Sequence, residues 1–529
     1  MVLTSYPRLS VFIRGPLPFD LLIAAGFRLN FVVNKYLMSN HNSRSGPIDL
    51  LSIARQAMLE AGFVPDIPPE VSREVQILES KPAASTGQTR DLRKLLWSSI
   101  DDRKSRDLDQ VEYAERLQNG NIRVLVGIAD VDNLVTLGSA IDDHARRNST
   151  SVYTGVRTFH MLPEELSTDL TSLVEAADRA AIIIEMTVSN DGRVTASDVY
   201  QALVHNYAKL SYEAVGAWLD HGGPLPEGIA KVPNMEAQIR TQTEAAQRLH
   251  EMRLANGALT LDTIKAVPVV DESGKVKDLA VTERNSARDL IENFMIAANV
   301  AMAQFLEAKQ APLLRRVVRT PTRWDRIVEL ARELGAELPT QPDSRALARF
   351  LESRRASDPD HFPDLSIAIV KLLGPGEYTV QTAASLEDTG HFGLAVNDYT
   401  HSTAPNRRFA DLVTQRSVKA ALRNDPAPYS ESQLTEIAQH CTEREDAARK
   451  VERKMRKVAA ALLLHDRIGS VFDAIVTGVS SKGTFARTIK PPVDGRIVRR
   501  EDGLQVGNKV HVKLIDTDAR RGFIDFERI

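Results

Sequence analysis

The chain has 529 residues, enough for roughly two to four domains of ordinary size. Its hydrophobic content of 43% and charged content of 26% are those of a globular protein, and the net charge of -3 excludes bulk basicity as a source of nucleic-acid binding. The one cysteine, Cys441, excludes an intramolecular disulfide, and we expect it to be an inert buried thiol.

The most apolar early stretch, residues 19–33, is too short and too polar to span a bilayer, because it carries Arg28 and Asn30. The sequence therefore predicts no membrane association and a cytoplasmic location.

Residues 1–75 are predicted to form a small helical domain, with a helix-turn-helix as one alternative. Apolar side chains recur at helical spacing over residues 47–60, and Gly62 ends that helix. From about residue 92 the pattern changes to short strands broken by turns. These strands are predicted at residues 95–100, 122–129, 181–188 and 194–204, the last two joined by a hairpin turn at 190–192.

Helices are predicted over residues 286–307, 410–423 and 434–466. Five short strands with Gly-rich turns follow, at residues 470–480, 483–488, 495–498, 509–516 and 521–526. Five strands in a segment of this size are typical of an OB-fold barrel that binds single-stranded nucleic acid. The predicted fold class is α+β, in which a catalytic domain at residues 76–466 (a mixed β-sheet or barrel surrounded by helices) lies between the helical N-terminal domain and an OB-fold barrel at 467–529.

Three aspartates, Asp101, Asp107 and Asp109, follow the apolar strand 95–100. Carboxylates that converge at a strand end repel one another unless a cation neutralises them. A small set of hard oxygen ligands suits Mg²⁺. The spacing alone leaves open, and favours, the alternative of a solvated acidic turn.

A second motif lies at residues 403–411, where a Pro-containing turn places Arg407 and Arg408 just before a helix. An arginine in this position can clamp a phosphate with two hydrogen bonds and stabilise charge that develops in a transition state. The alternative is a helix N-terminus with surface arginines. Further basic clusters, each either an RNA track or a solvated helix face, lie at residues 315–323, 354–355 and 450–457.

A family resemblance joins the two motifs into one site. Residues 100–110, 127–131, 147–153, 161–167, 208–213, 290–299, 391–394 and 403–411 resemble, in order, the motifs of the ribonuclease II family of RNB-type exoribonucleases, which includes ribonuclease R. The resemblance covers about residues 100–423 and implies an RNB-type catalytic domain. It also implies 3′→5′ hydrolysis of single-stranded RNA to nucleoside 5′-monophosphates, in RNA degradation or processing, by a protein that we expect to be a monomer.

The resemblance also implies the roles of individual residues. Asp101, Asp107 and Asp109, with Gln110, would hold the catalytic Mg²⁺, or Mn²⁺ as the alternative ion; Asp107, Asp109 and Arg407 would be catalytic, with Arg407 on the scissile phosphate. Tyr153 would stack on the 3′-terminal base, an interaction that contributes about 1–3 kcal/mol. Glu292 would accept a hydrogen bond from a ribose 2′-hydroxyl, which distinguishes RNA from DNA, and Tyr212 would contact RNA nearby.

Two positions depart from the family pattern. Gln110 stands where the family has a fourth aspartate, so one metal is expected to bind more weakly, and the neighbouring Asp102 is out of register as a substitute. Leu261 stands at the second aromatic clamp position. Gln110 supports the rival hypothesis of a catalytically weak or inactive RNB-fold protein that binds RNA or has a regulatory role.

The N-terminal segment departs from the family pattern, whereas the C-terminal barrel resembles the RNA-binding barrel that the family usually carries. The segment before the catalytic domain is too short for the two cold-shock barrels that the family usually carries, so RNA is expected to be gathered differently. The C-terminal barrel offers Phe472, Phe485 and His511 as stacking residues, with core packing as the alternative for each.

Overall fold

The structure is a computed structural model that describes residues 49–80, 89–262, 266–271, 276–281, 284–359, 361–382, 390–481 and 483–529. Most of the predicted N-terminal domain lies outside these residues. Within them, no helix is both long enough and apolar enough to cross a membrane.

A six-stranded mixed sheet forms the centre of the predicted catalytic domain, in the order β1-β8-β2-β3-β4-β7. Its strands are β1 (Arg90–Asp91), β2 (Trp97–Asp101), β3 (Gln110–Arg116), β4 (Ile122–Ala129), β7 (Asp178–Val188) and β8 (Val194–Ser211). The last strand in this order, β7, also pairs with β8, so strands β8, β2, β3, β4 and β7 close into a ring, and β1 pairs with β8. The four predicted strands and the hairpin are confirmed.

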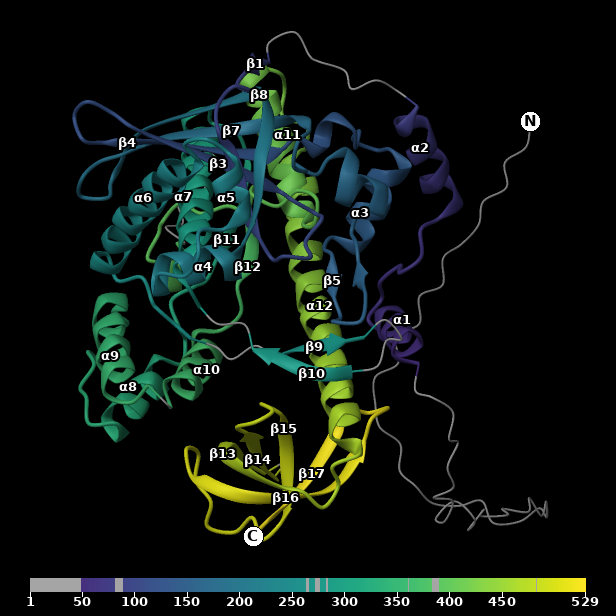
Figure 1. The fold of residues 1–529 in the computed structure, drawn as a ribbon, viewed down its shortest axis with the longest axis vertical. Helices are drawn as coiled ribbons and strands as arrows, with labels where there is room; N and C mark the ends of the chain where they lie inside the picture. The colour runs from purple at the N-terminus through teal and green to yellow at the C-terminus, as the bar shows by residue number, and fades with distance from the viewer. Residues whose placement is uncertain are drawn as a thin grey trace, which may run out of the picture. The chain divides into compact units, whose positions relative to one another are not determined.

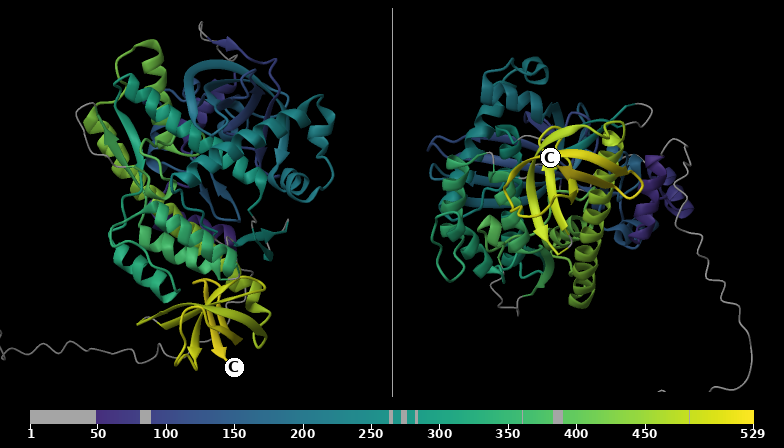
Figure 2. Two further views of the ribbon diagram at one scale, coloured as in Figure 1. Left: turned by 90° about the vertical axis from the view of Figure 1, so that its left-hand side faces the viewer. Right: turned by 90° about the horizontal axis from the view of Figure 1, so that it is seen from below.

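Two helices, α6 (Met235–Ala255) and α7 (Ser286–Ala308), cover one face of this sheet (Figures 1 and 2). Leu290, Phe294 and Met302 of α7 share a core with Val124 and Val126 of β4. The other face packs on the short helix α3 (Ala140–Asn148) and on α11 (Phe409–Arg423), which is almost wholly buried. The predicted helices at 286–307 and 410–423 are confirmed.

The N-terminal helices pack on the rest of the described chain. Ala54 and Met58 of α1 (Leu50–Glu60) share a hydrophobic cluster with Val451 and Met455 of the long helix α12 (Glu431–His465). Figure 1 shows α1 beside α12. Helix α2 (Pro69–Glu79) contacts α3. Helix formation here is confirmed over the described part, and the separate domain of 1–75 stays a prediction.

Smaller elements surround these layers. Helices α8 (Trp324–Glu333), α9 (Ser344–Ser357) and α10 (Phe362–Leu373) enclose a hydrophobic cluster of their own. The remaining elements are η1 (Val131–Asn133), β5 (Val152–Tyr153), β6 (Thr158–Phe159), η2 (Leu166–Leu170), α4 (Tyr212–His221), α5 (Glu227–Lys231), β9 (Ala266–Val270), β10 (Val276–Val281), β11 (Leu313–Val317), β12 (Glu377–Gln381) and η3 (Phe392–Leu394).

The C-terminal strands form a closed five-stranded barrel in the order β13-β14-β15-β17-β16. They are β13 (Val471–Ser480), β14 (Gly483–Thr488), β15 (Asp494–Arg499), β16 (Lys509–Asp518) and β17 (Phe523–Arg528). Helix α12 leads into the barrel and contacts β16 and β17 (Figure 1). The predicted OB-fold barrel is confirmed.

Candidate active site

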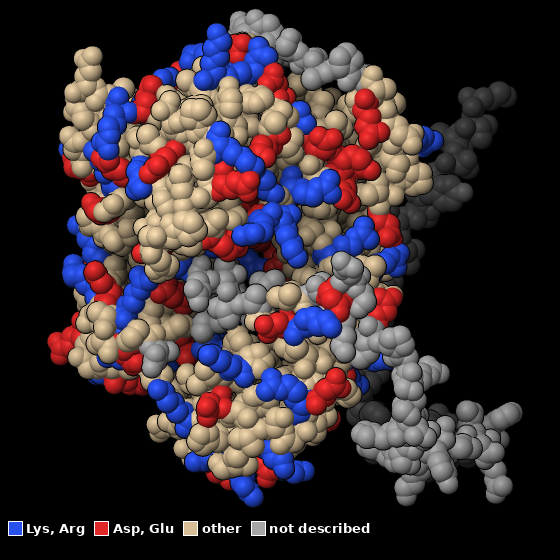
Figure 3. Space-filling model, viewed as in Figure 1, with Lys and Arg blue, Asp and Glu red and all other residues tan. Residues whose placement is uncertain are grey.

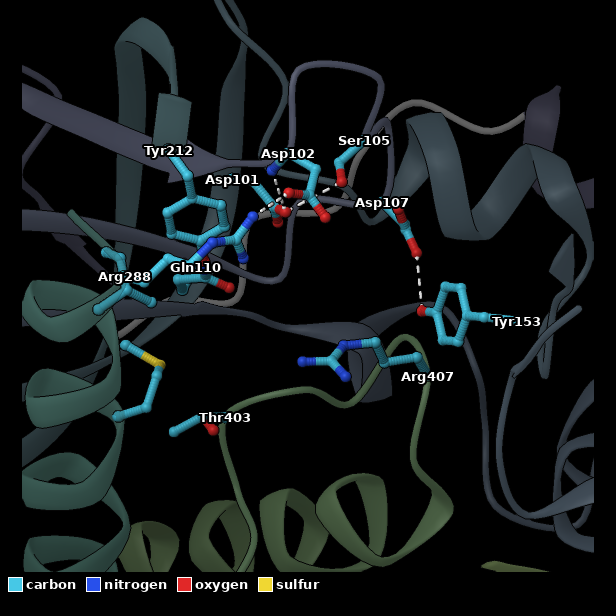
Figure 4. A pocket seen from close by; sticks show the side chains of 12 residues that line it. Asp101, Asp102, Ser105, Asp107, Gln110, Tyr153, Tyr212, Arg288, Thr403 and Arg407 are labelled. Carbon is cyan, nitrogen blue, oxygen red and sulfur yellow. Dashed lines mark hydrogen bonds and ion pairs between the residues drawn. The ribbon is translucent and has the colours of Figure 1, made fainter. Parts of the chain in front are cut away.

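A polar pocket of approximately 280 Å³ opens where β2 ends and β3 begins (Figure 4). Its lining comes from the aspartate motif, from β5, α4 and α7, and from the turn before α11. The lining residues are Asp101, Asp102, Ser105, Asp107, Gln110, Tyr153, Tyr212, Arg288, Ile291, Met295, Thr403 and Arg407. The two motifs that lie three hundred residues apart in the sequence therefore meet in one cavity.

An ion pair between Asp109 and Arg407 joins the motifs directly. Arg407 Nε donates to Asp109 Oδ2 at 2.9 Å, and the backbone N–H of Asn406 donates to Asp109 Oδ1 at 3.1 Å. Asp109 is 2% exposed, and burial raises the pKa of its carboxyl to about 7, although the charge of Arg407 opposes that rise. Burial lowers the pKa of Arg407, but Asp109, Tyr153 and Asp411 together raise that pKa by more, so the guanidinium stays charged.

The nitrogen that binds Asp109 is Nε, so the outer edge of the Arg407 guanidinium faces the pocket (Figure 4). In the described part of the chain, the Asp109 contact is the one hydrogen bond that this guanidinium makes. The two terminal nitrogens are thus placed for a phosphate that enters the pocket.

Tyr153 closes the other side of the pocket. Its hydroxyl donates to Asp107 Oδ2 at 3.2 Å (Figure 4). Its backbone N–H donates to Glu452 Oε1 at 3.1 Å. Tyr153 is 43% exposed, so it is not part of the hydrophobic core. A ring held at its hydroxyl with an open face can stack on a base.

The side-chain oxygen atoms in the pocket are of the type that binds a hard divalent cation. Asp101 and Asp107 supply carboxylate oxygens and Gln110 a carbonyl oxygen, and all three line the cavity. Burial raises the pKa of Asp101, and the hydrogen bonds from Asp102 N–H and Ser105 and the charge of Arg407 oppose this rise only in part. Within the described residues, however, no three acidic, histidine or cysteine side chains converge into a preformed metal cluster, and Asp109 faces Arg407 instead.

A cationic residue that the sequence analysis missed, Arg288, lies at the pocket edge. Its guanidinium carbon is 4.2 Å from the centre of the Tyr212 ring, and its Nη2 is 2.7 Å from Asp102 Oδ1. Arg288 precedes Glu292 by four residues on α7, so both lie on one helix face. That spacing is the signal in the sequence that could have found it.

The other two residues predicted to contact RNA do not line the pocket. Glu292 is 46% exposed and lies 3.8 Å from both Arg253 and Arg284. Leu261 packs against the cluster of α8–α10. Their predicted contacts with RNA stay predictions.

Two other sequence predictions have a definite outcome in the packing. Cys441 is a free buried thiol whose pKa burial raises to about 12. Arg315 and Arg316, predicted as members of a basic cluster, are buried in ion pairs with Asp398 and Glu445, so this pair is no RNA track. On the face shown in Figure 3, the Lys and Arg side chains are interspersed with Asp and Glu.

In the barrel, the three proposed stacking residues differ in exposure. Phe472 is buried, which is the core-packing alternative. Phe485 is exposed, and so is His511, whose Nδ1 lies 2.8 Å from Asp473 Oδ1. Phe485 and His511 therefore remain open to a base.

Comparisons with known proteins agree with this geometry. A family model described as the RNB domain matches residues 89–424, and one described as the RNase II-type exonuclease C-terminal S1 domain matches residues 470–529. Ribonuclease R of Escherichia coli (strain K12) is 29% identical over 537 residues, which cover 96% of this chain and 63% of that protein. Ribonuclease R of Thermotoga maritima is 30% identical over 513 residues, which cover 90% of this chain and 70% of that protein.

The fold is similar to that of Mycoplasma genitalium RNase R, solved in complex with ribose methylated single-stranded RNA. The TM-score is 0.81 at 24% sequence identity, over 91% of this chain and 78% of that one. The chain spans less than two thirds of the length of its Escherichia coli relative.

Proposed function

The chain belongs to the RNB-domain family, and from this premise we propose that it is a 3′→5′ exoribonuclease that hydrolyses single-stranded RNA to nucleoside 5′-monophosphates. The observation that carries the proposal is the meeting of the aspartate motif and Arg407 in one polar pocket. Relatives that match over most of this chain are named ribonuclease R, which supports the same reaction. We further propose that it acts as a cytoplasmic monomer.

Asp101, Asp107, Asp109 and Gln110 would hold Mg²⁺, with Mn²⁺ as the alternative. Asp101, Asp107 and Gln110 line the pocket, whereas Asp109 is paired with Arg407. A bound divalent cation supplies a nucleophile at neutral pH and neutralises charge on the phosphate. The protein's own contribution is to place carboxylates on one side of the pocket and a guanidinium on the other.

Arg407 would bind the non-bridging oxygens of the scissile phosphate through its two terminal nitrogens. Asp109 fixes the guanidinium through Nε, so the arginine is oriented before substrate arrives. A preoriented cation costs little reorganisation as negative charge develops in the transition state.

Tyr153 would stack on the 3′-terminal base and thereby set the position of cleavage at one nucleotide from the end. The Asp107–Tyr153 hydrogen bond ties this stacking ring to a residue of the acidic set. Glu292 and Tyr212 would contact the nucleotides that precede it, with Glu292 as the acceptor for a 2′-hydroxyl.

The test is a time course on 5′-labelled single-stranded RNA with Mg²⁺, with Mn²⁺ in parallel. An all-DNA strand and EDTA are the controls. We expect stepwise shortening of RNA alone, release of nucleoside 5′-monophosphates, and arrest by EDTA. Intact RNA with either cation would refute the proposal and favour the rival RNA-binding protein.

A further inference from the structure

Two adjacent hydroxyl side chains, Thr171 and Ser172, contact both motifs of the pocket without lining it. Thr171 is 4% exposed and Ser172 is 0% exposed. They follow η2 directly and belong to neither the aspartate motif nor the arginine motif. Each hydroxyl nevertheless forms hydrogen bonds with one of the two motifs, so this residue pair connects the two sides of the site.

The Ser172 hydroxyl holds the backbone on both sides of Asp107. Its oxygen accepts a hydrogen bond from Leu108 N–H at 2.9 Å, and it donates to the backbone oxygen of Arg106 at 2.7 Å. Residues 105–108 form neither a helix nor a strand, so regular secondary structure does not fix this stretch. Ser172 therefore fixes the point of the backbone from which the Asp107 side chain reaches the pocket.

Thr171 makes the corresponding contact with the arginine motif. Its hydroxyl hydrogen is shared between Asn406 Oδ1 and the backbone oxygen of Leu166, the latter at 2.8 Å. Asn406 is 0% exposed, and in the described part of the chain this is the one hydrogen bond of its side chain, since Nδ2 has no partner. Asn406 precedes Arg407, and its backbone N–H donates to Asp109 Oδ1 at 3.1 Å. Thr171 therefore supports the turn that presents Arg407.

We propose that Thr171 and Ser172 are positioning residues, which together hold Asp107 and the Arg407 turn in the relative position that cleavage requires. Because the two residues are neighbours in the chain, one short segment fixes both sides of the pocket. A displacement of about 1 Å at a reacting group can cost about 100-fold in rate. Neither residue touches RNA or the cation. This inference rests on the proposed function, because it takes Asp107 and Arg407 as the groups that act on the phosphate.

The alternative is that the two hydroxyls only stabilise the fold where η2 ends. Loss of a buried hydroxyl leaves its partners unpaired and lowers stability in any part of a protein. Thr442 is the matched control, because its hydroxyl donates to Ala438 O at 2.9 Å and accepts from Tyr378 N–H at 2.9 Å. It joins α12 to β12 and does not line the pocket. Thr442→Val should lower the unfolding temperature and leave kcat and Mn²⁺ affinity unchanged.

The experiment measures kcat and KM on 5′-labelled RNA, Mn²⁺ binding to RNA-free protein by electron paramagnetic resonance, and the unfolding temperature of each variant. Ser172→Ala should lower both kcat and Mn²⁺ affinity about tenfold, within the range for residues behind metal ligands, and leave KM unchanged. Thr171→Val should lower kcat about tenfold through Arg407, with Mn²⁺ affinity unchanged because Asp101 and Asp107 stay in place. Thr171→Ser keeps the hydroxyl and should return kcat to the wild-type value.

An unchanged kcat in either Ser172→Ala or Thr171→Val would overturn the inference. An equal fall of kcat in Thr442→Val, or a failure of Thr171→Ser to restore kcat, would also overturn it, because the cause would then be lost stability. Should Ser172→Ala fail to fold, Ser172→Cys replaces it, since a thiol is close in size to the hydroxyl and forms only weak hydrogen bonds. The same outcomes then decide.

These outcomes are separate from those of the proposed function. A wild-type protein that binds Mn²⁺ but does not shorten RNA refutes the exonuclease proposal, and the Mn²⁺ affinity of Ser172→Ala then decides whether Ser172 positions Asp107. A wild-type protein that shortens RNA at the same rate as Ser172→Ala and Thr171→Val refutes this inference alone.

Discussion

Replacing Arg407 by lysine separates the charge of this residue from its geometry. Lysine keeps one positive charge but loses both the Nε that binds Asp109 at 2.9 Å and the paired terminal nitrogens that face the pocket. An ammonium on a flexible stem can satisfy either the carboxylate or the phosphate, but it cannot bridge them as a planar fork does. The substitution should therefore impair transition-state stabilisation more than RNA binding.

The magnitude follows from these contacts. Loss of one preoriented donor to developing charge costs about 2.7–4 kcal/mol, which corresponds to a fall of about 10²–10³ in kcat. KM should change less than about threefold, because Tyr153 and the barrel are also proposed to bind the RNA. Losing the hydrogen bond to a charged group costs about 1.5–3 kcal/mol of stability, at the lower end here because the Arg407 side chain is 41% exposed.

The assay is single-turnover degradation of 5′-labelled RNA, with binding measured separately in EDTA. Arg106→Lys is the control, because Arg106 lies in the same loop as Asp107 and is 66% exposed. A kcat within threefold of the wild type, or a loss confined to KM, would refute the role given to Arg407. An equal fall of kcat in Arg106→Lys would show that any arginine-to-lysine change near the pocket has this effect, and that the geometry of Arg407 is not its cause.

Three further predictions follow from single residues. Asp109→Asn should abolish cleavage while filter binding of RNA persists, and normal turnover would contradict the assignment of the acidic set. Leu261→Phe should raise the affinity for short oligonucleotides and alter the end-product length on a sequencing gel. An unchanged product length would contradict the placement of Leu261 at the second aromatic clamp position. Burial, with Arg316 nearby, lowers the pKa of His391 to about 4. Between pH 6.5 and 4 the unfolded state therefore binds a proton at this residue and the folded state does not. As pH falls through this range, up to about 3 kcal/mol of the free energy of unfolding is lost. His391→Gln should flatten this fall in urea unfolding, whereas the same change at the exposed His221 should not.

Much of the fold could be predicted from local pattern. The apolar run of β4 predicted its bounds, and the stripe Leu290, Phe294 and Met302 predicted α7, because each pattern reflects burial in the final core. Strand β8 runs seven residues beyond its predicted end, to Ser211. The last part of β8 carries the polar residues Asn206 and Lys209, so the local sequence does not predict a strand there. The strand forms because this part pairs with β2, which is distant in the sequence.

The site could be predicted only in part. Asp109 and Arg407 are 298 residues apart, so no local pattern joins them, and the family resemblance was needed. The burial of Glu112 and the pairing of Arg315 with Asp398 depend on which face of a strand meets which helix or loop. From the sequence alone such charged residues are expected at the surface, and only the tertiary structure shows that they are buried.

The pairing of charges in the pocket separates two arginines that look equivalent in sequence. Arg288 is engaged twice, by Asp102 and by the face of Tyr212, so its guanidinium fixes α7 against α4. Arg407 is bound through Nε alone and keeps its terminal nitrogens toward the cavity. Because the acids with neutral partners, Asp101 and Asp107, lie across that cavity, a phosphate between them and Arg407 would meet positive charge from both sides once a cation is bound. Asp102, already paired with Arg288, is therefore less available to a cation than Asp101 and Asp107 are.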